Sequence, residues 1–282
     1  MTIAAGFRCV DGVVLCADTE MSAGYSKFSQ SKFRMYNKLE SRPAFIYAGD
    51  RDFSFMAIRQ IAKEIARAMP KRADVVEAIE KKALEIHTRY YPLSTEQRVF
   101  DLQAIVVIHL DQKERRLFLI NGPTVSPVDH AECLGTGSFL GTYVLQTMFS
   151  KHATVWEAAH VAAYLLFLTK THGAYCGHDS EIMIFSNTGG WQTFPNDPME
   201  TVSIKEMEAD FSALQFNIGN VLTNLLNFKL GKKEYAAILK GFTERMETLR
   251  EKRSKQIQAY IEREIERQEA YQQEEDNLEE EP

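Results

Sequence analysis

The stretch T-I-A-A-G-F-R-C-V-D-G-V-V-L-C-A-D-T-E-M-S-A-G, residues 2–24, decides the architecture of this chain. Its small and apolar residues alternate as they do in a β-strand, so that Ile3, Ala5 and Phe7 fall on one face of residues 2–10. Asp11-Gly12 then predicts a two-residue hairpin turn, with residues 13–18 as the return strand. The chain therefore opens with an antiparallel pair of strands directly after Met1.

Working outward from this hairpin, the periodicity of apolar residues predicts strands and helices in separate blocks. Strands are expected at residues 2–10, 13–18, 33–39, 44–48, 99–110, 116–121, 133–134, 181–186 and 191–194. Helices are expected at residues 53–69, 73–90, 139–149 and 154–171. Blocks of this kind indicate an α+β sandwich in which antiparallel sheets lie between layers of helices.

The chain changes character after residue 203. Residues 207–228 and 232–241 predict helix, and residues 242–281 contain no glycine or proline. The apolar residues of that last segment form only a narrow stripe, which suits either a long helix packed on a partner or its own copy, or a solvated helix that frays into an acidic tail. We expect a globular domain at residues 1–198, a helical extension at 199–273 and an acidic disordered tail at 274–282.

Charge and cysteine content limit the class of protein. The formal net charge is −6, and residues 274–282 carry six acidic side chains and no Lys or Arg, so the rest of the chain is neutral. A neutral body argues against a nucleic-acid partner, which requires a clustered basic surface. The four cysteines include no C-x-x-C pair, which indicates free thiols in a reducing cytosol rather than a zinc site. The amino terminus lacks a signal peptide, and no apolar run is long enough to span a membrane, so we expect a cytoplasmic protein.

Two glycine-containing motifs are candidate sites. G-T-G-S at residues 135–138 lies between a strand and a helix, where a turn can cradle phosphate, but no lysine follows and the dinucleotide spacing is missing. H-G-A-Y-C-G-H-D at residues 172–179 offers a cysteine, two histidines and an aspartate for a nucleophile or a metal site. A loop whose polar groups meet water or the backbone is the favoured reading of the second motif.

The amino terminus is itself a candidate site. Thr2 follows Met1, and a small residue in second place permits removal of the initiator methionine. A terminal threonine carries a hydroxyl nucleophile and a free amine on one residue, and that amine titrates near pH ~7.7–8.0, so it accepts a proton at neutral pH. Many proteins begin Met-Thr, so this signal needs support from other residues.

That support comes from a resemblance. Residues 2–24 are similar to the start of proteasome β-type subunits, which belong to the amino-terminal-nucleophile hydrolases: a first threonine, an early glycine, then D-G-V-V and an A-D-x-x strand end. A-G-D at residues 48–50 and G-T-G-S-F-L-G at residues 135–141 resemble later landmarks of the family, in the same order. The resemblance covers residues 2–195, includes the bacterial branches such as the ancestral β subunit, and implies a four-layer αββα sandwich followed here by a C-terminal helical extension.

The resemblance assigns roles residue by residue. Thr2 matches the nucleophile, Asp18 the strand-end acid that orients a catalytic lysine, and Gly49 the glycine whose N–H forms the oxyanion hole. At the place of that lysine the best register puts Arg34, with Lys32 two residues earlier on the same strand face. Arginine keeps the positive charge but cannot release a proton.

Further positions keep or lose family features. Thr136 stands where the family has a serine and keeps its hydroxyl, whereas Gly173 and Cys176 stand where the family has an aspartate and a serine. These departures leave open whether the site is active, re-tuned or silent.

The leading function is a proteasome-like threonine-type peptidase subunit that cleaves peptides or unfolded protein with Thr2 after loss of Met1. The alternatives are a catalytically silent ring or scaffold subunit and an amidase of the same fold acting on a small amide. The resemblance implies a homo-oligomeric ring and no metal or organic cofactor, and leaves the identity of any cap or unfoldase unknown.

Overall fold

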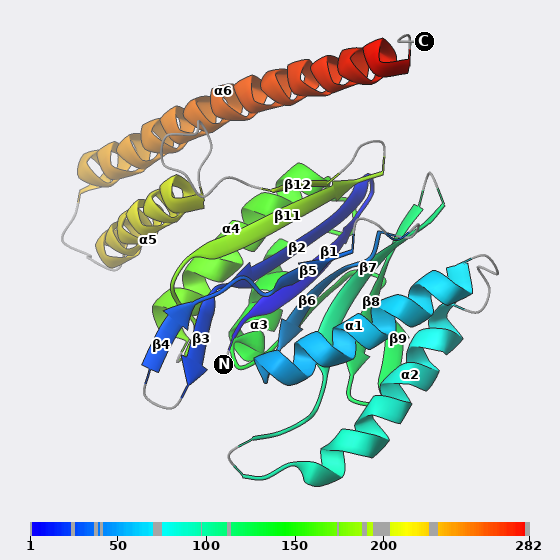
Figure 1. The fold of residues 1–282 in the computed structure, drawn as a ribbon. Helices are drawn as coiled ribbons and strands as arrows, with labels where there is room; N and C mark the ends of the chain where they lie inside the picture. The colour runs from blue at the N-terminus through cyan, green and yellow to red at the C-terminus, as the bar shows by residue number, and fades with distance from the viewer. Residues whose placement is uncertain are drawn as a thin grey trace. The chain divides into compact units, whose positions relative to one another are not determined.

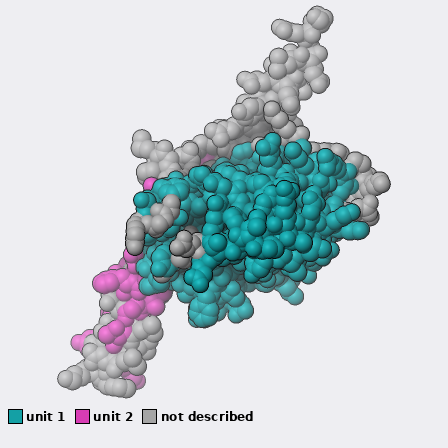
Figure 2. Space-filling view, turned by 60° about the horizontal axis from the view of Figure 1, so that its bottom comes forward, with its two compact units in different colours: residues 1–194 teal, residues 195–282 magenta. Residues whose placement is uncertain are grey.

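The computed structural model describes residues 2–23, 26–36, 39, 42–69, 75–96, 98–111, 114–173, 175–187, 191–193, 204–225 and 231–279. The chain divides into two compact units, residues 1–194 and 195–282, drawn in teal and magenta in Figure 2. The boundary expected from the sequence, between residues 198 and 199, lies outside the described residues. Each unit is described by itself below.

The opening hairpin lies within the first five-stranded sheet of unit 1, in which every neighbouring pair of strands is antiparallel. The strand order is β10 (Ala131–Leu134), β1 (Ala4–Cys9), β2 (Gly12–Asp18), β11 (Ser180–Ser186) and β12 (Trp191–Thr193). All seven residues of β2 are buried, because both faces of the sheet are covered.

The turn of this hairpin differs from the prediction by one residue. Cys9 pairs with Gly12, so the loop is Val10-Asp11 and Gly12 is the first residue of β2. A Cβ on Gly12 would lie 2.2 Å from the carbonyl oxygen of Phe185 in β11. The glycine is therefore required for the close approach of a neighbouring strand rather than for the turn.

A second five-stranded antiparallel sheet faces the first. Its order is β5 (Phe33–Met35), β6 (Ala44–Ala48), β7 (Gln103–Asp111), β8 (Glu114–Asn121) and β9 (Thr124–Pro127). A separate two-stranded ribbon is formed by β3 (Glu20–Ala23) and β4 (Ser26–Ser29). The sequence did not predict β3, β4 or β9, which are four residues each. β4 is exposed throughout and β9 almost so, and neither has the buried face on which a sequence pattern depends. In β3 the adjacent residues Glu20 and Met21 are both buried, which does not give the alternation of a strand with one buried face.

Helices cover the outer face of each sheet, which completes four layers (Figure 1). The second sheet packs on α1 (Arg51–Ala68) and α2 (Val75–Tyr90), the latter followed by the 3-10 turn η2 (Tyr91–Leu93); the first sheet packs on α3 (Ser138–Met148) and α4 (Val155–His172). One apolar core lies between the sheets and another between the second sheet and its helices. The predicted α+β class is confirmed.

Unit 2 consists of two helices in its described part, α5 (Ile204–Leu225) and α6 (Lys232–Glu279), which contact each other. Helix α6 continues through residues 274–279, where the sequence predicted a disordered tail. Glutamate and glutamine are good helix formers, and residues 242–279 contain no glycine or proline that would end the helix. Among the described residues, no helix combines the length and apolarity needed to cross a membrane.

Candidate active site

Thr2 lies just before β1, and its backbone is held by the loop between β10 and α3. The Thr2 N–H donates to Thr136 Oγ1 at 3.3 Å, and the Gly137 N–H donates to the Thr2 carbonyl oxygen at 3.1 Å. Gly135 has φ +85°, and a Cβ there would lie 2.3 Å from the Thr2 carbonyl oxygen. The G-T-G-S motif therefore closes over the amino terminus of the chain instead of presenting a free phosphate cradle.

The side chain of Thr2 faces Asp18, the last residue of β2. Thr2 Oγ1 donates to Asp18 Oδ1 at 2.5 Å, and the Ile3 N–H donates to the same oxygen at 3.0 Å. Asp18 is completely buried. Its second oxygen, Oδ2, accepts from the Gly177 N–H at 3.0 Å. A carboxylate with this many donors is held in one orientation.

Lys32 supplies the positive charge of the site. Its Nζ lies 2.5 Å from Asp18 Oδ1, and its side chain is 1% exposed. Burial lowers the pKa of Lys32, and the opposite charge and hydrogen bond of Asp18 act against that shift. The two residues form a buried ion pair, in which removal of either partner would leave an uncompensated charge.

Arg34, to which the sequence assigned this position, lies elsewhere. Its guanidinium carbon sits 3.5 Å from the centroid of the Phe55 ring on α1, and its Nη1 donates to the Phe33 carbonyl oxygen at 2.9 Å. The register was wrong because β5 begins at Phe33, so Lys32 precedes the strand and does not obey its two-residue period. Within β5, Phe33 packs between the sheets and Arg34 lies on the face covered by α1.

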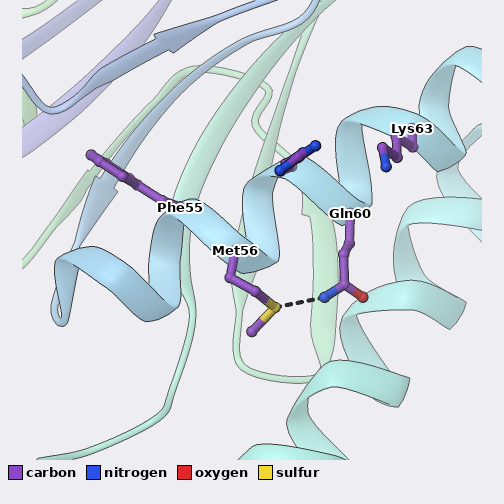
Figure 3. A pocket seen from close by; sticks show the side chains of 5 residues that line it. Phe55, Met56, Gln60 and Lys63 are labelled. Carbon is purple, nitrogen blue, oxygen red and sulfur yellow. Dashed lines mark hydrogen bonds between the residues drawn. The ribbon is translucent and has the colours of Figure 1, made fainter.

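Phe55 also lines a surface recess of about 470 Å³ on α1, shown in Figure 3. The other lining residues are polar or flexible: Met56, Arg59, Gln60 and Lys63. Gln60 Nε2 donates to Met56 Sδ at 2.6 Å, the contact drawn as a dashed line. None of these residues belongs to the cluster around Thr2, so we assign the recess no part in the chemistry of that cluster.

The motif at residues 172–179 contributes to the site through its backbone and its cysteine. Cys176 is 6% exposed, and its thiol forms a hydrogen bond with Thr136. Burial and the nearby Asp18 charge raise the pKa of Cys176 to about 11, so the group is a neutral thiol at neutral pH. Among the described residues, no group of three or more His, Cys, Asp or Glu side chains has metal-binding geometry.

The loop that carries Cys176 has unusual backbone geometry. Tyr175 and His178, on either side of Cys176 and Gly177, have φ of +71° and +57°. Residues in this region cost of order ~1–3 kcal/mol each and persist where the surrounding structure holds them, which is common at functional sites. Gly173 ends α4, and a Cβ there would lie 2.5 Å from the Thr169 carbonyl oxygen. This backbone therefore has no room for the aspartate of the family pattern.

Gly49 lies at the turn between β6 and α1. It has φ +103°, which favours glycine, and it precedes Asp50, the N-cap of α1. The geometry thus explains the glycine, and its role as an oxyanion donor stays a prediction.

Three residues of the cluster, Ile3, Gly177 and Glu181, were not predicted from the sequence. The N–H groups of Ile3 and Gly177 bind Asp18, and backbone donors leave no residue-type signal. Glu181 accepts hydrogen bonds from the Ser31 side chain and the Lys32 N–H, and burial raises its pKa. This glutamate fixes the segment that carries Lys32, and only its position in a predicted strand could have drawn attention to it.

Taken together, the geometry offers a hydroxyl nucleophile, a buried carboxylate–ammonium pair that orients and polarises it, and a second hydroxyl beside its backbone nitrogen. This arrangement suits acyl transfer, in which a hydroxyl needs a proton acceptor and a fixed orientation.

Known proteins are similar to this chain in sequence and in fold. No protein-family model matches the chain. A proteasome subunit beta 2 from Thermofilum pendens is 23% identical over 201 residues, which cover 71% of this chain and 96% of that protein. A proteasome subunit alpha from Methanococcus maripaludis is 25% identical over 210 residues, covering 73% and 76% of the two chains. The homology to proteasome subunits is weak but consistent.

Solved structures share the fold. Anbu from Hyphomicrobium sp. strain MC1 aligns with a TM-score of 0.61 at 16% identity, covering 77% of this chain and 97% of that chain. Anbu, an ancestral β-subunit, from Yersinia bercovieri aligns with a TM-score of 0.62 at 13% identity, covering 82% and 98%. The predicted resemblance and fold are confirmed.

Proposed function

We propose that this chain, a homologue of proteasome subunits, is a threonine-type peptidase subunit that hydrolyses peptide bonds with Thr2 after Met1 has been removed. The observation that carries the proposal is the buried triplet Thr2–Asp18–Lys32, with both Thr2 Oγ1 and Lys32 Nζ at 2.5 Å from Asp18 Oδ1. A buried ion pair costs desolvation energy and is weak evidence for stability, so its placement against a hydroxyl supports a chemical role.

The reaction follows from these contacts. Thr2 Oγ1 attacks the peptide carbonyl carbon, and its proton passes to the free amine of Thr2, directly or through a water. The new oxyanion then collapses, the C–N bond breaks, and the amine returns the proton to the departing nitrogen. Water hydrolyses the resulting ester by the same route in reverse. The hydroxyl and amine share one residue, so the acceptor is held within reach throughout.

The surrounding residues have distinct parts in this proposal. The Lys32 ammonium lowers the energy of the developing alkoxide, and Asp18 fixes both groups. Thr136 holds the nitrogen of Thr2 at 3.3 Å and in turn contacts the Cys176 thiol. Gly49 N–H is the proposed oxyanion donor. Arg34 is given no part, because its guanidinium packs on Phe55.

The first prediction concerns maturation. Intact-mass measurement of the purified protein is expected to give the mass of the chain beginning at Thr2, because only a free amine can act as the base. A Thr2→Leu variant is the control, since a bulky second residue keeps the methionine. Retention of Met1 in all wild-type molecules would contradict the peptidase proposal.

A second candidate, a silent ring subunit, has one observation in its favour. Thr2 is only 2% exposed, so its hydroxyl does not face solvent in the chain that carries Met1. The same mass measurement separates the two candidates when it is combined with an assay on short fluorogenic peptide amides. A chain that keeps Met1 and cleaves nothing would be a structural subunit.

We also propose that the chain works as a homo-oligomer in the cytoplasm. Its relatives are named as proteasome subunits, and its four cysteines are free thiols, as a reducing compartment requires. Helix α3 exposes Phe139 at 90% and Tyr143 at 63%, beside a recess of about 490 Å³. Exposed apolar patches of this kind mark contact surfaces.

The second prediction tests the helical extension. Helix α6 has 48 residues and, at ~1.5 Å per residue, extends over ~70 Å. A helix with only a thin apolar stripe buries little surface by itself, so we expect a partner surface to stabilise α6. Truncation after Leu239 is expected to yield a smaller particle by light scattering, because a partner surface on α6 is lost. Truncation after Gln273 is the control and should leave the particle unchanged. Equal particle mass and thermal stability in all three proteins would exclude α6 as an assembly element.

A further inference from the structure

The backbone turn at Gly49 is fixed by the residues on either side of it, and not by atoms that pack against Gly49 itself. Among the described residues other than its two chain neighbours, a Cβ added to Gly49 would approach a single atom within 4 Å, the Asp101 carbonyl oxygen at 3.8 Å. Glycine also has the widest choice of backbone conformations. The orientation of its peptide N–H is therefore set by Ala48, which is paired in the sheet with Gln103, and by Asp50.

Asp50 is fixed by two sets of contacts. Its Oδ1 accepts from the Phe53 N–H at 2.9 Å, which caps α1. Its carboxylate also binds the guanidinium of Arg98 through two bonds, Nε to Oδ2 at 2.7 Å and Nη2 to Oδ1 at 3.0 Å. Burial alone would raise the pKa of Asp50, but the bonds from Arg98 and Phe53 hold it below its usual value.

Arg98 is held in place by other contacts besides those with Asp50. Its N–H and carbonyl oxygen both bond to the backbone of Thr95, at 3.2 and 2.9 Å, and its N–H also donates to Thr95 Oγ1. Its guanidinium lies 4.8 Å from the Phe100 ring centroid, and Phe100 packs edge-on against Phe53 of α1. The position of the Arg98 guanidinium is thus restrained by the backbone bonds to Thr95 and by the Phe100 ring.

We propose that Arg98 is a positioning residue that holds the Gly49–Asp50 turn in the orientation needed for the Gly49 N–H to bind the oxyanion. Two parallel bonds fix the plane of the Asp50 carboxylate, which a single bond or a charge alone does not. The Arg98 side chain is 51% exposed, and exposed ion pairs contribute little to stability. The Arg98–Asp50 pair therefore affects the orientation of the Gly49–Asp50 turn more than the free energy of unfolding. The catalytic part of this proposal rests on the function proposed above.

The test compares five full-length variants with the wild type. Arg98→Gln is expected to lower kcat on a fluorogenic peptide amide by roughly 10-fold with KM within about twofold, because misorientation of an oxyanion donor acts on the transition state. Arg98→Lys should recover part of the loss. Asp50→Asn keeps an N-cap residue and loses the ion pair, so it should match Arg98→Gln, and the double variant should lose no more than either. Arg67→Gln, which breaks an exposed ion pair at the far end of α1, should change nothing.

Amide hydrogen exchange over residues 48–53 provides a readout that needs no activity. Faster exchange in Arg98→Gln and Asp50→Asn, but not in Arg67→Gln, is the expected result. Unchanged exchange in Arg98→Gln would overturn the proposal whatever the kinetics. Faster exchange with unchanged kcat in an active enzyme would overturn its catalytic part. If the processed wild type cleaves no peptide, the proposed function fails, while the exchange result still decides whether Arg98 holds the turn.

Discussion

Replacement of Thr2 by alanine is expected to reduce kcat for peptide amides by at least ~10³-fold, because the hydroxyl is the atom that forms the covalent bond. Asp18 would keep its other donors, Ile3 N–H, Lys32 Nζ and Gly177 N–H, so the loss of one hydrogen bond should cost only ~1 kcal/mol of stability. Turnover of a fluorogenic peptide panel, together with a thermal unfolding curve, measures both effects.

Thr2→Ser is the matched control. Serine keeps the hydroxyl and the amine and loses only a methyl group, so it should retain measurable turnover. Alanine, serine and threonine all permit removal of Met1, and intact mass should verify this for each protein. Activity of Thr2→Ala equal to that of the wild type would remove Thr2 from the mechanism.

Lys32 and Arg34 are expected to differ sharply although they are two residues apart. Lys32→Ala should lower turnover by ~10²–10⁴-fold, since it removes the cation beside the nucleophile. It should also destabilise the fold by ~3–5 kcal/mol, because Asp18 would be left as an unpaired buried charge. Arg34→Ala should change turnover by less than about twofold, because it removes a cation–π contact with Phe55 worth ~0.5–1 kcal/mol and a hydrogen bond to the Phe33 carbonyl oxygen, neither of which involves Thr2.

A variant of Lys32 that keeps the charge separates the effect on the stability of the fold from the effect on turnover. Lys32→Arg keeps the positive charge beside Asp18 but cannot release a proton. A folded Lys32→Arg protein with low turnover would indicate that the lysine takes part in proton movement. A larger loss in Arg34→Ala than in Lys32→Ala would return the catalytic role to Arg34 and contradict the geometry described here.

The sequence was sufficient to predict the opening hairpin and the helices. Residues of β1 and β2 alternate or are buried on both faces, and the apolar stripes of α1 and α2 follow the helical period. Such patterns are local, so they can be read without knowing what packs against them. The four-residue ribbon of β3 and β4 left no such pattern, and Gly12 was assigned to the turn because its contact with Phe185 is not local.

The residues of the candidate site also fall into those that could be identified from the sequence and those that could not. Thr2 could be identified because it follows Met1 in a stretch that resembles the start of proteasome β-type subunits, and Asp18 because it matches the strand-end acid of that stretch and is the last residue of β2. The choice between Lys32 and Arg34 could not, since one side chain precedes β5 and the other lies within it. The contacts of Thr2 with Thr136 and of Asp18 with Gly177 join residues 134 and 159 positions apart. By itself the sequence determined the layers and pointed to Thr2 as the proposed nucleophile. The tertiary structure decided which cation and which backbone donors surround Thr2 and Asp18, because those contacts depend on where separate strands end and not on any local period.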